Sequence, residues 1–142
     1  MAILMEQVFP VESGAYATAG EASTTIKRKL KQLGIDANVL RRVSVASYEV
    51  ELNLVIHSMG GTLTLQVDPE KVTLISQDVG PGIPDIDKAM TEGYSTANEE
   101  ARTLGFGAGM GLPNMRRNAT DFDIQSQVGV GTTIMMSFAL KG

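Results

Sequence analysis

Two very short connections between strand-like segments constrain the fold of this chain most. The segments pair as residues 62–67 with 71–77 and residues 122–126 with 132–140, and each has the apolar pattern of a strand. Asp68-Pro69-Glu70 separates the first pair and a Gly129-Val130-Gly131 turn joins the second. Parallel strands need a crossover of a dozen or more residues, so connections this short indicate antiparallel hairpins.

Helical periodicity occupies the region before the first hairpin. Apolar residues recur at helical spacing over residues 14–33, which Gly34 ends, and again over residues 36–56, which Asp36 can cap. A strand is expected at residues 3–9, a short helix at 84–90 and a last helix at 112–118. This order favours an α/β two-layer sandwich, with helices on one face of a mixed, largely antiparallel sheet. The length of 142 residues fits one domain, residues 1–142.

Composition excludes several classes of function. The net charge is −4 and the 12 Lys and Arg residues are scattered, which argues against a nucleic-acid partner. With no cysteine and one histidine, a thiolate or zinc site is not expected, whereas Mg²⁺, which takes oxygen ligands, stays open. No apolar stretch approaches the ~20 residues that span a bilayer. No membrane association is expected, and the default location is the cytoplasm.

Two glycine-rich segments carry the candidate ligand site. Asp78 ends a buried strand and opens Asp78-Val79-Gly80-Pro81-Gly82-Ile83, where its carboxylate can accept a hydrogen bond from a ligand amine such as that of adenine. The second segment, residues 105–112, brings closely spaced glycines to a helix beginning at Leu112, and a helix N-terminus favours phosphate. It matches neither a dinucleotide fingerprint nor a P-loop. A flexible linker is the alternative.

A polar stripe lies on the second predicted helix, where Glu49, Asn53 and His57 stand four residues apart. The Asn53 amide oxygen can ligate Mg²⁺, and Glu49 can accept a proton from an attacking hydroxyl. The alternative is that Glu49 and Asn53 merely bond each other on a solvated face. His57 is expected to cap or pack the helix end, and Glu51 to be a surface charge.

Three motifs together resemble the boxes of the GHKL ATP-binding superfamily, whose members share the Bergerat fold. They are Glu49-x-x-x-Asn53, Asp78-x-Gly80-x-Gly82 and Gly107-x-Gly109-x-Gly111-Leu112, in this order and at these separations. Within that group, residues 78–86 and 92–96 most resemble the small bacterial serine/threonine protein kinases of partner-switching systems, which include anti-sigma factors. The insert at residues 97–104 is longer than this resemblance leads us to expect.

The resemblance implies a role for each matched residue. Asp78 would bind the adenine amine, Gly80, Gly82 and Ile83 would lie beside the base, and Thr132 would add a polar contact. Asn53 would hold Mg²⁺ on the phosphates of ATP, and Glu49 would be the catalytic base. The residues wrapping the phosphates would be Gly105, Gly107, Gly109, Gly111 and Leu112. They run from the end of a lid, formed by the long loop of residues 91–109, into the start of the last helix.

The expected function is that of an ATP- and Mg²⁺-dependent kinase that phosphorylates a Ser or Thr on a small antagonist protein. A sigma factor or another regulator would be a further partner. The alternative is a nucleotide-gated binding module with little or no phosphotransfer. Lys27-Arg28-Lys29 is a candidate partner surface, and homodimerisation is expected by analogy alone.

Overall fold

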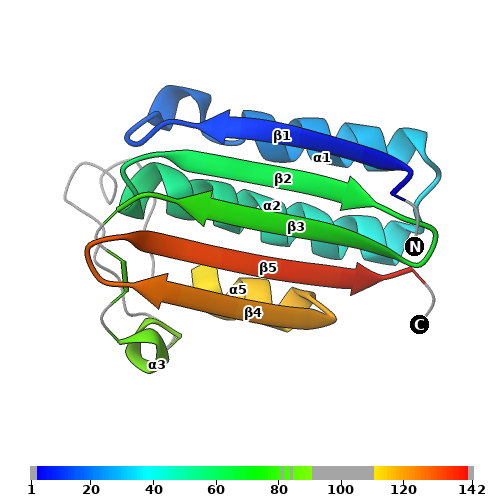
Figure 1. Ribbon diagram of the computed structural model, residues 1–142. Coiled ribbons are helices and arrows are strands. Elements are labelled where there is room, and N and C mark those ends of the chain that lie inside the picture. The colour runs from blue at the N-terminus through cyan, green and yellow to red at the C-terminus, as the bar shows by residue number, and fades with distance from the viewer. Residues whose placement is uncertain (1–2, 81, 84, 91–110, 141–142) are drawn as a thin grey trace.

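The computed structural model describes residues 3–80, 82–83, 85–90 and 111–140 (Figure 1). Its elements in chain order are β1 (Met5–Val11), a 3₁₀ turn η1 (Tyr16–Thr18), α1 (Glu21–Gln32), α2 (Ala37–His57), β2 (Gly61–Val67), β3 (Lys71–Asp78), α3 (Ile86–Ala89), α5 (Gly111–Asn118), β4 (Asp121–Gln127) and β5 (Gly131–Ala139). Every strand and helix expected from the sequence in these ranges is present, with some ends displaced.

The strands form one sheet in the order β1-β2-β3-β5-β4. Both predicted hairpins are confirmed, and all four pairings between described strands are antiparallel. A mixed sheet, as expected from the sequence, would also contain a parallel pair of strands. No such pair occurs in the described part of the chain. Strands β3 and β5 are distant in sequence but adjacent in the sheet, which brings the end of β3 beside the start of β5.

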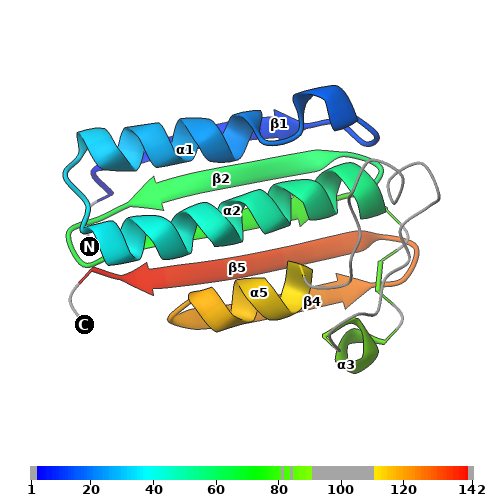
Figure 2. The ribbon, with the colours of Figure 1, turned by 180° about the vertical axis from the view of Figure 1, so that it is seen from behind.

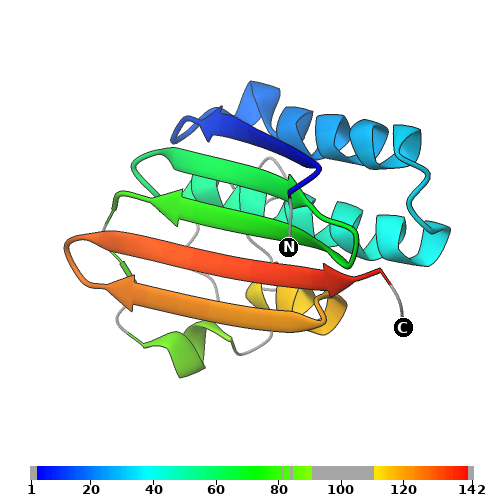
Figure 3. The same ribbon diagram turned by 45° about the vertical axis from the view of Figure 1, so that its right-hand side comes forward.

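The predicted two-layer arrangement is confirmed. Helices α1, α2 and α5 lie across one face of the sheet (Figure 2), and among the described elements none covers the other face (Figure 3). Inward-facing strand residues such as Leu74 and Phe138 pack against α2 residues such as Val50 and Leu54, and these four side chains are fully buried. No described helix combines the length and the apolar character needed to cross a membrane.

Two element ends differ from the sequence expectation for identifiable reasons. The helix expected from residue 14 begins only at Glu21, because Gly20 at its N-cap adopts a left-handed φ of 102° that a continuing helix cannot contain. Strand β1 continues through Pro10, which the sequence placed outside it. Pro10 is tolerated because β1 is an edge strand, where a missing N–H costs little.

The expectation that Glu51 is a surface charge is wrong. Glu51 is 3% exposed, and its carboxylate accepts hydrogen bonds from the backbone N–H groups of Ala22 (3.1 Å) and Ser23 (2.9 Å). The first N–H groups of a helix have no partner within the helix, and Gly20 has no side chain to cap them. Glu51 on α2 therefore caps α1 and fixes the two helices together.

Candidate functional site

Asp78 occupies the last position of β3, enclosed by the strands on either side. Its Oδ1 accepts the backbone N–H of Thr132 on β5 at 2.9 Å, and Gly61 on β2 is its partner in register. A Cβ on Gly131 would collide with the backbone oxygen of Asp78, and a Cβ on Gly61 would collide with the carbonyl oxygen of Gln77. The two glycines thus let the strands close around the carboxylate.

The surroundings of Asp78 suit an acceptor for a ligand amine. Burial raises the pKa of the Asp78 carboxyl, and the hydrogen bond from Thr132 lowers it in part. Among the described residues, Oδ2 has no hydrogen-bond partner. One oxygen is therefore held by the protein while the other is available to a ligand donor.

The predicted base-binding turn packs closely against the rest of the site. Gly80 donates its N–H to the carbonyl of Val130 at 3.2 Å. Gly82 has a φ of 74°, and a Cβ there would lie 2.5 Å from the carbonyl oxygen of Gln127. Residues 81 and 84 lie outside the described part of the chain. Glycine is needed at position 82 both for the backbone conformation and for this close approach.

Ser126 is the residue that sequence reasoning missed at this turn. Its Oγ accepts the N–H of Ile83 at 2.7 Å and lies 2.8 Å from Oγ1 of Thr132. The signal was present in the strand pattern, since Ser126 follows Phe122 and Ile124 on the inward face of β4, where another apolar residue would be expected. Its register partner is Thr132, a relation that the sequence alone does not reveal.

Glu49 faces the start of α5. The side chain is half-buried, and a Cβ on Gly111 would lie 3.2 Å from Glu49 Oε2. Burial raises the pKa of the Glu49 carboxyl, and a hydrogen bond with the side chain of Asn114 lowers it in part. Among the described residues no hydrogen bond joins Glu49 to Asn53, so the alternative of a mutually bonded surface pair is not supported.

Asn53 lies one helical turn after Glu49 with a half-buried side chain. No group of three or more His, Cys, Asp or Glu that could hold a metal occurs among the described residues. A single amide oxygen such as that of Asn53 suits a Mg²⁺ ion whose other ligands are phosphate oxygens and water molecules. It does not suit a metal ion that the protein alone would coordinate.

The structure describes only some of the remaining predicted site residues. Gly111 and Leu112 open α5, where the Leu112 side chain is 8% exposed and belongs to the core, so its backbone is what could meet a ligand. Gly105, Gly107, Gly109 and the predicted lid, residues 91–109, lie outside the described residues, as does the side chain of His57.

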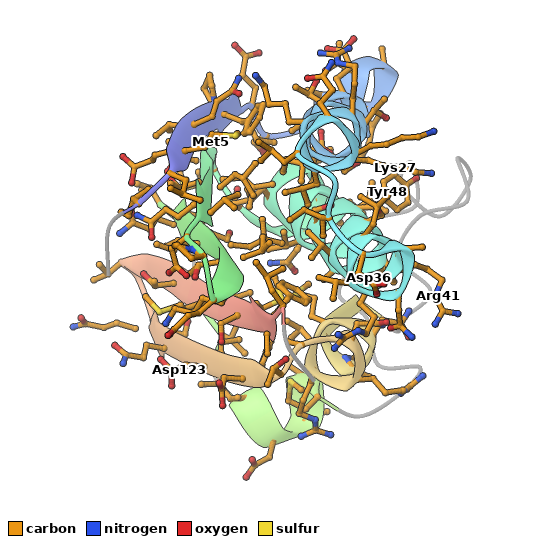
Figure 4. The ribbon with its side chains drawn as sticks, turned by 90° about the vertical axis from the view of Figure 1, so that its right-hand side faces the viewer. Met5, Lys27, Asp36, Arg41, Tyr48 and Asp123 are labelled. Atoms are coloured by element: carbon orange, nitrogen blue, oxygen red, sulfur yellow. The ribbon has the colours of Figure 1, made fainter. Side chains whose placement is uncertain are left out.

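A separate cleft of about 610 Å³ lies beside the start of α1, lined by Ala19, Gly20, Glu21, Thr24, Thr25 and Tyr48. Tyr48 and Lys27 project from the helix layer on the side away from the sheet, whereas Asp123 lies on the sheet side (Figure 4). The cleft contains none of the residues predicted to bind nucleotide. The nucleotide site at Asp78 and Glu49 stays a prediction, and this cleft is not part of it.

Comparisons with known proteins show which proteins this chain resembles. A family model described as "Histidine kinase-, DNA gyrase B-, and HSP90-like ATPase" matches residues 24–142, a range that includes every candidate site residue. The serine/threonine-protein kinase RsbT of Bacillus subtilis (strain 168) is 32% identical over 108 residues, covering 73% of this chain and 75% of that protein. The anti-sigma F factor of Thermoanaerobacter sp. (strain X514) is 30% identical over 121 residues, covering 82% of this chain and 81% of that protein.

A solved structure shows the same fold. The nucleotide-free catalytic domain of histidine kinase ThkA matches with a TM-score of 0.53 at 16% identity, covering 96% of both chains. At that identity the likeness concerns the fold alone. It agrees with the antiparallel sheet and single helical layer described above.

Proposed function

Because this chain belongs to the histidine kinase-, DNA gyrase B- and HSP90-like ATPase family, we propose that it is a single-domain, ATP- and Mg²⁺-dependent kinase that phosphorylates a Ser or Thr on a small antagonist protein. Family membership implies ATP binding. Homology to RsbT, named as a serine/threonine-protein kinase, supports the choice of acceptor. The observation that carries the proposal is Glu49, a half-buried carboxylate facing the start of α5 one turn before Asn53.

Adenine would be held at the end of β3. Oδ2 of Asp78, which has no partner in the described part of the chain, would accept the exocyclic amine, while Thr132 keeps Oδ1 in place. Gly80 and Gly82 would let the backbone of the turn pass close to the base. Because Thr132 already holds the Asp78 side chain before ATP binds, less side-chain entropy would be lost on binding.

The phosphates would lie between α2 and the start of α5. The first N–H groups and the dipole of α5 favour negative charge, and Gly111 leaves room beside Glu49. Asn53 would provide an amide oxygen to Mg²⁺, which when bound neutralises charge on the phosphates. Gly105, Gly107 and Gly109 would complete the enclosure.

Glu49 would act as the general base of the transfer. The acceptor hydroxyl oxygen forms a bond to the γ-phosphorus, its proton passes to Glu49, and the bond from the γ-phosphorus to the bridging oxygen breaks to release ADP. A raised pKa makes the Glu49 carboxylate a stronger proton acceptor than an ordinary glutamate. Asn114 would hold the carboxylate in position through its hydrogen bond.

A second candidate function is a nucleotide-gated binding module that sequesters a sigma factor or another regulator with little or no transfer. The 30% identity to an anti-sigma F factor favours it, because that name describes binding. In either case we place the protein in the cytoplasm. Lys27 and Arg28 are exposed on α1 and stay candidates for the partner surface, and a homodimer stays a proposal.

Phosphotransfer separates the two functions. The protein is incubated with Mg²⁺, ATP labelled at the γ-phosphate, and candidate antagonist proteins encoded by neighbouring genes. We expect label on a Ser or Thr of one antagonist, identified by mass spectrometry. A complex that depends on ATP but leaves the partner unlabelled would instead support the binding module.

A further inference from the structure

Ser126 links two parts of the candidate base site that are far apart in sequence. Its hydroxyl accepts the N–H of Ile83, in the glycine turn, and contacts the hydroxyl of Thr132 on β5. Thr132 in turn donates its backbone N–H to Asp78. Ser126, Thr132 and Asp78 thus come from three adjacent strands and form one connected row at the same end of the sheet.

The protons of this row can be arranged in two ways. A serine or threonine hydroxyl has one proton to donate and two lone pairs. Ser126 Oγ lies 3.3 Å from the carbonyl oxygen of Gly131 and 2.8 Å from Thr132 Oγ1. If Ser126 donates to Gly131, Thr132 donates to Ser126 and offers only lone pairs to a ligand. If Ser126 donates to Thr132, the Thr132 proton is free for a ligand acceptor.

The second arrangement matches an adenine edge. Adenine carries an exocyclic amine, which donates, next to a ring nitrogen, which accepts, whereas guanine carries a carbonyl oxygen in place of the amine. Asp78 Oδ2 suits the amine, and a donating Thr132 hydroxyl suits the adjacent ring nitrogen. A Thr132 hydroxyl that could only accept would leave that ring nitrogen without a partner.

We propose that Ser126 is a positioning and specificity-determining residue of the nucleobase site, which anchors the turn at Ile83 and orients the Thr132 hydroxyl as a donor to the base. The inference rests on the proposed function, because it takes the ligand to be ATP. Ser126 itself would not contact the nucleotide. Its effect passes through Thr132 and Ile83.

The test compares two nucleotides and three proteins. Dissociation constants for ATP and for 1-deaza-ATP, which keeps the amine but has carbon in place of the adjacent ring nitrogen, are measured by calorimetry for the wild type, Ser126→Ala and Ser137→Ala. Ser137 is the matched control, because it also makes a hydroxyl bond across β4 and β5, to Asp121 at 3.2 Å, away from Asp78. Ser126→Cys keeps the branching of the side chain, with a slightly larger thiol that is only a weak donor and acceptor, and it replaces Ser126→Ala if that variant does not fold.

We expect Ser126→Ala to raise the dissociation constant for ATP about tenfold, and that for 1-deaza-ATP by about threefold or less, since only ATP loses the bond through Thr132. Ser137→Ala should change neither. An equal loss for both nucleotides, or no loss, would overturn the inference while leaving ATP binding by the wild type intact. Absence of ATP binding by the wild type would overturn the proposed function, and this inference with it.

Discussion

The backbone N–H of Thr132 donates to Oδ1 of Asp78 at 2.9 Å, so a β5 residue holds the carboxylate that ends β3. The two residues are 54 positions apart in sequence, and only the β3–β5 pairing brings them together. Oδ1 is occupied, whereas Oδ2 has no partner among the described residues. We propose that the two oxygens have different tasks, the first fixing the side chain and the second accepting the adenine amine.

Asp78→Asn should separate these two tasks. The Asn oxygen can still accept the Thr132 N–H, but its amide nitrogen would present a donor where adenine also presents a donor. We expect the dissociation constant for ATP to rise about 10- to 100-fold, measured by calorimetry, with the circular dichroism spectrum unchanged. Asp123→Asn, at an exposed position of β4, is the control and should bind ATP as the wild type does. Equal affinity of Asp78→Asn and the wild type would exclude the adenine role.

Gly131→Ala should displace the Asp78 carboxylate, because the added methyl group would collide with the backbone of Asp78. A Cβ at Gly131 would collide with the backbone oxygen of Asp78 and lie 3.3 Å from its Oδ1, so β3 or β5 must shift. We expect a loss of about 1–3 kcal/mol in the free energy of unfolding, measured with urea, together with weaker ATP binding.

Gly129→Ala is the comparison for this effect. Gly129 has a φ of 80°, and a Cβ there would meet no atom within 4 Å. The substitution should therefore cost stability through its backbone conformation, about 1–2 kcal/mol, without changing ATP affinity. If both alanine variants lost ATP affinity to the same degree, the steric account of Gly131 would be wrong.

Glu51→Ala should destabilise the packing of α1 on α2. It leaves the buried N–H groups of Ala22 and Ser23 without an acceptor, and hydrogen bonds to charged groups contribute about 1.5–3 kcal/mol each. Since the effects of neighbouring bonds overlap, we expect a total loss of about 2–4 kcal/mol in urea unfolding. Glu12→Ala, at an exposed position, should stay within about 0.5 kcal/mol of the wild type. A Glu51→Ala protein as stable as Glu12→Ala would show that the cap contributes nothing.

Much of the fold could be predicted because its signals are local. The short turns at Asp68 and Gly129 required antiparallel pairs, and apolar periodicity located the helices. The start of α1 could not be located, since the helical pattern continues upstream of Gly20 and only the conformation of that glycine interrupts it. The continuation of β1 through Pro10 depends on its position at the sheet edge, which is a property of the whole sheet.

Candidate site residues could be chosen where a residue type matched a motif, and their roles stay predictions. A residue whose role depends on strand pairing or helix packing could not be chosen in this way. Asp78, Glu49 and Asn53 stood out through their spacing. The roles of Ser126 and Gly61 depend on the residues that they contact on other parts of the fold, which the sequence alone does not reveal. Glu51 was misread because its partners belong to a different helix, 28 and 29 residues away.

The raised pKa of Glu49 predicts how stability depends on pH. A carboxyl whose pKa is higher in the folded state binds more protons there, so its contribution to stability is full below the unfolded-state pKa and is lost as the pH rises through the folded-state pKa. Glu49→Gln removes this loss, because glutamine does not titrate. Its stability relative to the wild type should increase as the pH rises above about 4, where the carboxyl of the unfolded chain ionises, and should level off once the pH has passed the raised folded-state pKa of Glu49.

Urea unfolding of both proteins over this pH range measures the difference directly. The Asp78 carboxyl, whose pKa is also raised, is common to both proteins, so its contribution cancels if the two sites are independent. A stability difference that does not change with pH would contradict the burial of the Glu49 carboxyl.

The rate of phosphotransfer by Glu49→Gln at saturating ATP tests the central claim most directly. Single-turnover transfer of labelled γ-phosphate to the antagonist protein is compared among the wild type, Glu49→Gln and the exposed control Glu70→Gln, with ATP affinity measured in parallel. The account predicts a fall of about 10²- to 10⁴-fold in Glu49→Gln with ATP affinity retained, and no change in Glu70→Gln. Transfer by Glu49→Gln at the wild-type rate would contradict the assignment of Glu49 as the base.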